Sequence, residues 1–184
     1  NSVLPNRIIS LQPTVCKPCF LFGAVNEETT ESLVKTLWGY ALEDERDGPI
    51  SLMLSSEGGD VPLGWSIIET VREIRNSCGA IVNTHVIGEC SSIAIPIFLS
   101  ATGERIVSRS SSFFIHNLQV DGASGKPSEM ARLATALEWM NESLYEFILK
   151  RTNLSPSMLK GMMDKDVHFT GEQAYEMGFA TQIR

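Results

Sequence analysis

Cysteine and histidine are scarce in this chain of 184 residues, which has four of the first and three of the second. Four cysteines do not suggest the disulfide framework of a small secreted protein. Cys16 and Cys19 form a C-K-P-C segment, which matches half of a zinc site or a redox pair. The chain has no second cysteine pair and no His-x-His spacing to complete a zinc site. We therefore expect packed cysteines, with no metal and no organic cofactor.

Positive charge is also in short supply, because 15 Lys and Arg residues stand against 22 Asp and Glu residues, for a net charge of −7. Such a balance gives little support to nucleic-acid or membrane-surface binding. No apolar run reaches the roughly 20 residues that a membrane span needs. The first residues, NSVLPNRIISLQP, lack the charged-then-apolar layout of a signal peptide. We expect a cytoplasmic protein with neither nucleic acid nor membrane as a partner.

Apolar segments alternate with amphipathic ones along most of the chain, which is long enough for one domain over 1–184. We predict buried strands at 19–25, 49–56 and 79–88, separated by helices, and a short apolar helix at 91–101. Residues 105–117 are typical of a β-hairpin or of two short strands. Helix caps are expected at Asn26, Ser155 and Thr170. The alternation predicts an α/β fold with a mostly parallel sheet and helices on both faces.

One long helix is expected from about residue 127 to residue 152. Its apolar residues are spaced 3-4-3-4-3, a heptad-like seam made of Met130, Leu133, Leu137, Met140, Leu144 and Phe147. The seam is explained equally well by an interface with another subunit and by packing on its own domain.

Two segments carry the residues of a possible hydrolase site. GECSSIAI, at 88–95, places a serine at the beginning of the short apolar helix, and FFIHN, at 113–117, places a histidine at the end of an apolar strand. A serine hydroxyl is a poor nucleophile until a nearby base takes its proton. A serine hydrolase is therefore the first hypothesis.

Four segments, in order, resemble motifs of the Clp peptidase (ClpP) proteolytic subunits, within the ClpP/crotonase fold. SSEGGDVPLGWSIIETV resembles the family's N-S-P-G-G motif and the helix after it, and VIGECSSIAIPIFLSATGERIV resembles the nucleophile motif. RSSSFFIHNL is similar to the motif that carries the base, and DKDVHFTGEQAYEMGFA to the one that carries the acid. The resemblance covers roughly residue 19 to the end. It implies repeated β-β-α units, a mostly parallel sheet and a protruding handle-like helix at 127–152.

The resemblance also implies a catalytic site. Ser92 is then the nucleophile, His116 the base and Asp166 the acid that orients the base. The backbone N–H groups of Gly59 and Ile93 would form the oxyanion hole. The implied activity is a serine endopeptidase that cleaves peptides or unfolded polypeptides inside a homo-oligomeric ring, with seven subunits and stacked rings as the expectation.

Each assignment has a competitor within the chain. Ser91 is adjacent to Ser92, and one of the two can serve as a helix cap. Asp164 is an alternative acid. His85 lies within a predicted strand, which is typical of a structural histidine. His168 stands where the family usually has an aromatic or apolar residue, and it is either a packed substitute or a second titrating group.

Two other functions fit the same fold. One is a structural or regulatory ring subunit that has lost turnover, and the other is an acyl-CoA-processing enzyme of the crotonase branch. Residues 1–18 resemble neither the axial loop of the family nor the segment that follows it, so the sequence gives only weak support to a Clp-type ATPase as a partner.

Overall fold

A computed structural model describes residues 17–43, 48–119 and 124–184. The strands are β1 Lys17–Val25, β2 Ile50–Gly59, β3 Val82–Ser91, β4 Arg105–Val107, β5 Ser112–Ile115, β6 Val167–Thr170 and β7 Gln182–Ile183. The helices are α1 Glu27–Ala41, α2 Val61–Cys78, α3 Ala94–Leu99, α4 Pro127–Leu149, α5 Pro156–Asp164 and α6 Gly171–Glu176. None of these helices combines the length and the apolar character needed to cross a membrane.

The strands form one sheet in the order β1-β2-β3-β4-β7, and β5 pairs with both β3 and β6. Of these pairings only β5–β6 is antiparallel. The predicted α/β fold with a mostly parallel sheet and a protruding helix is therefore confirmed. Along the described chain the units are strand–helix three times, followed by the strand–strand–helix unit β4-β5-α4.

Local sequence signals account for the helix boundaries. The side chain of Asn26 accepts a hydrogen bond from the N–H of Thr29 at the beginning of α1, and Asp60 does the same for Leu63 in α2. Ser155 and Thr170 cap α5 and α6 in the same way, so the three predicted caps are confirmed. α1 ends at Ala41, and the N–H of its C-cap, Leu42, donates to the carbonyl of Trp38.

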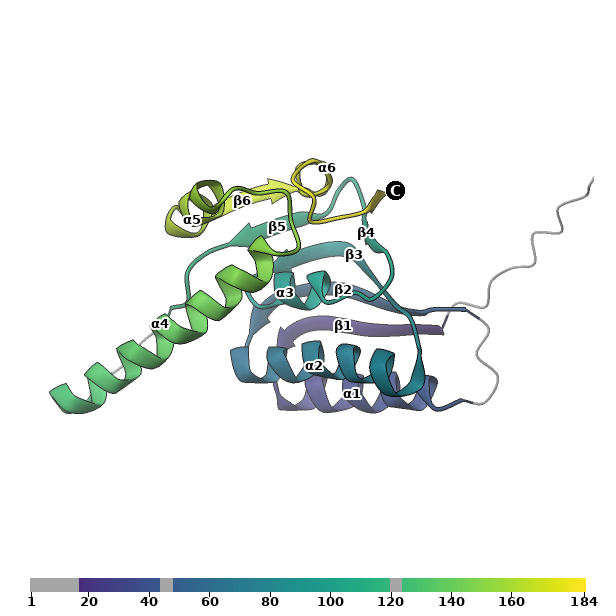
Figure 1. The fold of residues 1–184 in the computed structure, drawn as a ribbon, viewed down its shortest axis with the longest axis horizontal. Helices are drawn as coiled ribbons and strands as arrows, with labels where there is room; N and C mark the ends of the chain where they lie inside the picture. The colour runs from purple at the N-terminus through teal and green to yellow at the C-terminus, as the bar shows by residue number, and fades with distance from the viewer. Residues whose placement is uncertain (1–16, 44–47, 120–123) are drawn as a thin grey trace, which may run out of the picture.

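The first three strands are buried on one face only. Leu21, Leu52 and Val86 are fully buried on the face where α1, α2 and α3 pack (Figure 1). On the opposite face, Phe20 and Phe22 of β1 are 55% and 50% exposed. The prediction of helices on both faces of the sheet is therefore wrong for β1–β3. Their apolar side chains occur at both alternating positions, a pattern that periodicity does not distinguish from two-sided burial.

Of the two expectations for residues 105–117, the two short strands are confirmed and the hairpin is not, because β4 pairs with β3 and β7, whereas β5 pairs with β3 and β6. β2 and β3 continue three residues beyond their predicted ends, to Gly59 and Ser91. The added ladder partners, such as Ser56 with Cys90 and Val25 with Gly59, are contacts between distant segments that the local pattern does not reveal.

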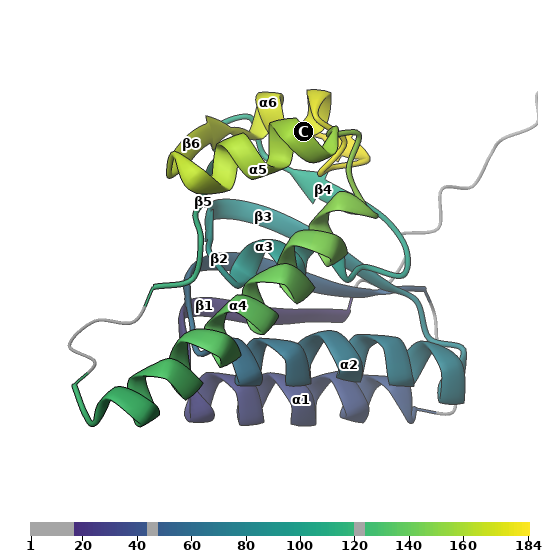
Figure 2. The ribbon, with the colours of Figure 1, turned by 60° about the vertical axis from the view of Figure 1, so that its left-hand side comes forward.

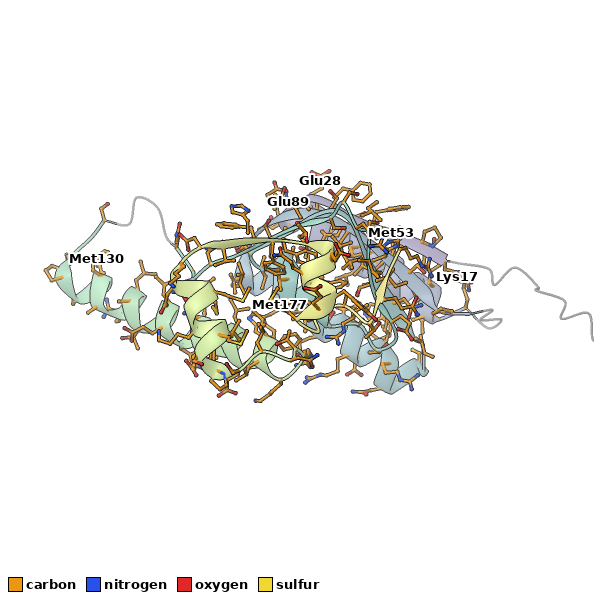
Figure 3. The ribbon with its side chains drawn as sticks, turned by 90° about the horizontal axis from the view of Figure 1, so that it is seen from above. Lys17, Glu28, Met53, Glu89, Met130 and Met177 are labelled. Atoms are coloured by element: carbon orange, nitrogen blue, oxygen red, sulfur yellow. The ribbon has the colours of Figure 1, made fainter. Side chains whose placement is uncertain are left out.

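The long helix α4 crosses the body and extends beyond it (Figures 1 and 2). Its last turns pack on the protein's own core, where Leu144 is 5% exposed and Phe147 makes an edge-to-face contact with Trp65. Met130 lies near the far end, away from the body (Figure 3). The expected packing on its own domain therefore holds for the carboxyl-terminal third of the seam, and an interface with another subunit stays a prediction for the rest.

Candidate active site

Ser92 lies on the sharp turn between β3 and α3 and has a positive φ of 54°. That conformation is uncommon for a residue with a Cβ. Two backbone hydrogen bonds hold it: the N–H of Ser92 donates to the carbonyl of Phe114 at 2.9 Å, and its carbonyl accepts from Ile95 at 3.0 Å. A strained strand–turn–helix of this kind is typical of turns that present a nucleophilic serine.

Ser91 has a different environment. It is the last residue of β3 and is only 3% exposed, and its Oγ donates a hydrogen bond of 2.7 Å to the carboxylate of Glu89. Ser92 is half-buried. Of the two serines, Ser91 has its hydroxyl engaged and its side chain covered, whereas Ser92 is the one that the turn presents.

Gly58 forms the wall beside Ser92. A Cβ at this position would come within 2.7 Å of both the Ser92 Cβ and the Ser91 carbonyl oxygen, and the φ of Gly58 is 92°. Glycine is therefore required both for space and for backbone conformation. This close approach brings the end of β2 against the turn that carries Ser92.

Two backbone N–H groups, those of Gly59 and Ile93, lie beside the turn that carries Ser92. Val25 of β1 is paired with Gly59, and its carbonyl accepts a 2.9 Å hydrogen bond from the N–H of Asp60. In a parallel ladder with this pattern, the N–H of Gly59 points away from β1, toward the side on which β3 lies. The second group is the N–H of Ile93, which has no acceptor among the described residues. Its nitrogen would lie 3.3 Å from a Cβ on Gly58.

His116 follows β5 directly, and its Nδ1 lies 2.6 Å from the carbonyl oxygen of Asn117. Because a carbonyl only accepts, Nδ1 carries the hydrogen, and the neutral ring keeps its lone pair on Nε2. This is the tautomer that a general base needs. A carbonyl of the chain itself, one residue further on, therefore holds the ring in that form.

Asp166 precedes β6 and is exposed, with a positive φ of 52°. The β5–β6 ladder ends with Ile115 opposite Val167, so Asp166 and His116 are the next residues in register. No hydrogen bond joins Asp166 to His116, or His116 to Ser92, within the described parts of the chain. The fold brings the three elements to one place, and the histidine is turned to Asn117.

Asp164, the alternative acid, is engaged by other partners. Its carboxylate accepts hydrogen bonds from Asn117 Nδ2 at 2.9 Å and from Lys160 at 3.0 Å, and these bonds lower the pKa of Asp164. Asn141 of α4 also donates to Asn117 Oδ1 at 2.9 Å. These side chains line a cavity of about 290 Å³ beside the segment that follows the histidine. Asp164 therefore anchors Asn117 rather than His116.

The other two histidines differ in environment. His85 lies within β3, with its Nε2 3.4 Å from Ser108 Oγ, and burial together with nearby Arg184 lowers its pKa. This agrees with the expected structural role. His168 is an exposed residue of β6, and its ring stacks on Phe114 with centroids 4.2 Å apart. Sequence reasoning missed Phe114, although its position two residues before His116 on one strand was a usable signal.

The cysteines and acidic residues of the described chain do not gather into a metal site, since no group of three or more potential ligands occurs there. Cys19 is buried on β1, while Cys16 lies outside the described residues. Cys90 is fully buried behind the turn, and this burial raises the pKa of its thiol well above the usual value.

Comparison with known proteins identifies the family of this chain. The sequence profile of the Clp protease family matches residues 14–184. The ATP-dependent Clp protease proteolytic subunit 2 of Treponema denticola is 27% identical over 164 residues, which make up 89% of this chain and 79% of that protein. The chain therefore belongs to the Clp protease family, as the four motifs indicated.

Proposed function

We propose that this protein is a serine endopeptidase of the ClpP type, with Ser92 as nucleophile, His116 as base and Asp166 as the orienting acid. The observation that carries the proposal is the strained turn that presents Ser92. It lies beside the N–H of Ile93, for which residues 17–43, 48–119 and 124–184 provide no acceptor, and beside the N–H of Gly59, which points to the same side. A hydroxyl flanked by two such donors is suited to acyl transfer.

The chemistry follows from these positions. Nε2 of His116 takes the proton of Ser92 Oγ as that oxygen attacks a peptide carbonyl. The negative oxygen that develops accepts hydrogen bonds from the N–H groups of Ile93 and Gly59. His116 returns the proton to the departing amine, and water then hydrolyses the acyl-enzyme. In the active form, Nδ1–H turns from the Asn117 carbonyl to Asp166, which stabilises the imidazolium.

Assembly into a homo-oligomeric ring, with seven subunits and paired rings, is part of the proposal. Two surfaces support it. One is the projecting part of α4, where Met130, Leu133, Leu137 and Met140 are half-exposed and Trp139 is 69% exposed. The other is the uncovered sheet face with Phe20 and Phe22. Apolar surfaces of this kind mark contacts between chains. Short peptides would diffuse into the chamber without an ATPase.

An inactive ring subunit is the second candidate. The observation that favours it is that the hydrogen bond of His116 goes to Asn117 and not to Asp166. The crotonase alternative gains no comparable support, because the family match extends over residues 14–184.

A fluorophosphonate probe and a short fluorogenic peptide separate the two candidates. The peptidase proposal expects the wild-type protein to be labelled and to cleave the peptide, Ser92→Ala to lose both properties, and Ser91→Ala to keep both. Labelling that survives in Ser92→Ala and disappears in Ser91→Ala would move the nucleophile by one residue. A wild-type protein that assembles into rings yet remains unlabelled would establish the inactive subunit.

A further inference from the structure

An open cavity of about 460 Å³ lies at the carboxyl-terminal end of α4. Arg105, the first residue of β4, lines it and joins β4 to the end of α4, because its Nη1 donates a 2.6 Å hydrogen bond to the carbonyl of Arg151. Leu99, the last residue of α3, lines the cavity as well. The cavity is therefore at the opposite end of α3 from the turn that carries Ser92.

The side chains that line this cavity carry positive charge only. Those able to donate a hydrogen bond are Arg105, Lys150, Arg151, Thr152, Asn153 and Thr181. Within the described residues, no carboxylate lines the cavity. Because the chain as a whole has a net charge of −7, three cations around one cavity are a local concentration of positive charge.

The two arginines of the cavity lack a charged partner. Neither Arg105 nor Arg151 forms an ion pair with any residue in 17–43, 48–119 or 124–184. Burial, and then the charge of Arg151, lowers the pKa of Arg105, while Glu104 acts in the opposite direction with a smaller effect. Burial also lowers the pKa of Arg151. Two neighbouring cations that are partly withdrawn from water cost free energy, and a bound anion would offset that cost.

The protein holds both guanidinium groups in place. The guanidinium carbon of Arg151 lies 3.6 Å from the centroid of the Phe147 ring, and its Nη1 donates to the carbonyl of Phe147 at 3.3 Å. Bonds from arginine to these carbonyls stabilise the end of α4. Each of them uses one of the five N–H donors of a guanidinium, however, and the described chain supplies no acceptor for the other donors of Arg105 and Arg151.

We propose that this cavity binds a phosphate-type oxyanion, with Arg105 and Arg151 as its principal ligands. A planar guanidinium presents paired N–H donors that match two oxygens of a phosphate group. The charge of the cavity favours phosphate over a carboxylate. Lys150 is shared with Glu146 at 2.8 Å, which leaves the two arginine charges without compensation. A phosphate group carries a charge of about −1.5 to −2 at neutral pH, whereas a carboxylate carries a single charge.

Isothermal titration calorimetry with sodium pyrophosphate, at constant low ionic strength, tests the site. The wild type is expected to bind one pyrophosphate per subunit, and to bind inorganic phosphate more weakly. Arg105→Gln and Arg151→Gln should each weaken pyrophosphate binding by about tenfold or more, because each removes hydrogen bonds from a charged donor. Arg109→Gln is the matched control, since Arg109 pairs with Glu172 and does not line the cavity. Its Kd for pyrophosphate should equal that of the wild type.

Ala101→Glu provides a second test that leaves both arginines in place. Ala101 is half-buried and lines the cavity, so the new carboxylate would compete with the anion. Pyrophosphate binding should be abolished, while circular dichroism shows an unchanged fold. A wild type that shows no saturable binding of pyrophosphate overturns the proposal, and so does an unchanged Kd in both arginine variants. A tetraglutamate peptide that binds more tightly than pyrophosphate would overturn the assignment to phosphate.

Discussion

The backbone N–H of Ser92 donates a 2.9 Å hydrogen bond to the carbonyl of Phe114, which ties the turn after β3 to the strand that carries His116. β5 pairs with β3 in parallel at this point, with Ser91 opposite Phe114. Two motifs that are 24 residues apart in the chain, at Ser92 and His116, are thereby fixed next to each other by main-chain contacts. Side-chain substitutions can therefore probe the site without removing the contact that builds it.

Gly58→Ala is expected to abolish fluorophosphonate labelling and to destabilise the protein by more than about 1 kcal/mol. The reason is that the new methyl group would lie 2.7 Å from the Ser92 Cβ, at a φ of 92°. Gly39→Ala is the matched control, because this exposed glycine of α1 has no atom within 4 Å of an added Cβ. The control should keep labelling and gain roughly 0.5–1 kcal/mol in urea unfolding. Full labelling of Gly58→Ala would show that β2 does not form the wall of the site.

Asp166→Asn is expected to lower kcat by a factor on the order of 10⁴, as in tightly coupled triads. Asp164→Asn should change kcat far less, because Asp164 binds Asn117 and Lys160. Steady-state kinetics with one fluorogenic peptide measures both variants. A large loss at Asp164 together with a small one at Asp166 would assign the acid to the end of α5.

Leu137→Glu together with Met130→Glu is expected to split the assembly, because both seam side chains are half-exposed and Met130 lies near the far end of α4, away from the body (Figure 3). Light scattering should report a smaller particle, while circular dichroism remains unchanged. Leu144 is unsuitable for this purpose, although it belongs to the same seam, since it is 5% exposed in its own core. Leu144→Ala should instead cost about 2–5 kcal/mol of unfolding free energy. An unchanged particle mass in the double variant would contradict the role of α4 in assembly.

The stability of the protein is expected to fall as pH decreases below the ordinary titration range of histidine, in part because of His85. Burial lowers the pKa of His85, so the unfolded chain binds a proton at a pH at which the folded chain does not. The contribution is complete above the ordinary pKa of histidine and is lost as pH falls through the lowered value. Urea midpoints at pH 7.5 and 5.5 should therefore differ less in His85→Gln than in the wild type. Equal pH dependence in the two proteins would contradict this role of His85.

The sequence by itself determined the local elements and their chemistry. Polar caps at Asn26 and Thr170 predicted where two helices begin, because such side chains satisfy the free N–H groups of a first turn. The order of the four motifs indicated the family and the α/β class. These features depend on neighbouring residues or on a pattern along the chain, and both can be recognised without coordinates.

Only the tertiary structure decided how those pieces meet. The 3-4 spacing of α4 could not show that Leu144 is covered while Met130 lies beyond the body, since a helical stripe does not identify its partner. The same holds for β5, whose dual pairing with β3 and β6 brings Phe114 into ring contact with both His116 and His168. Nδ1 of His116 lies 2.6 Å from the carbonyl oxygen of Asn117. Only the three-dimensional structure shows that this oxygen, and not Asp166, is its partner. Such contacts depend on chain packing in three dimensions, to which residue type and spacing are only an indirect guide.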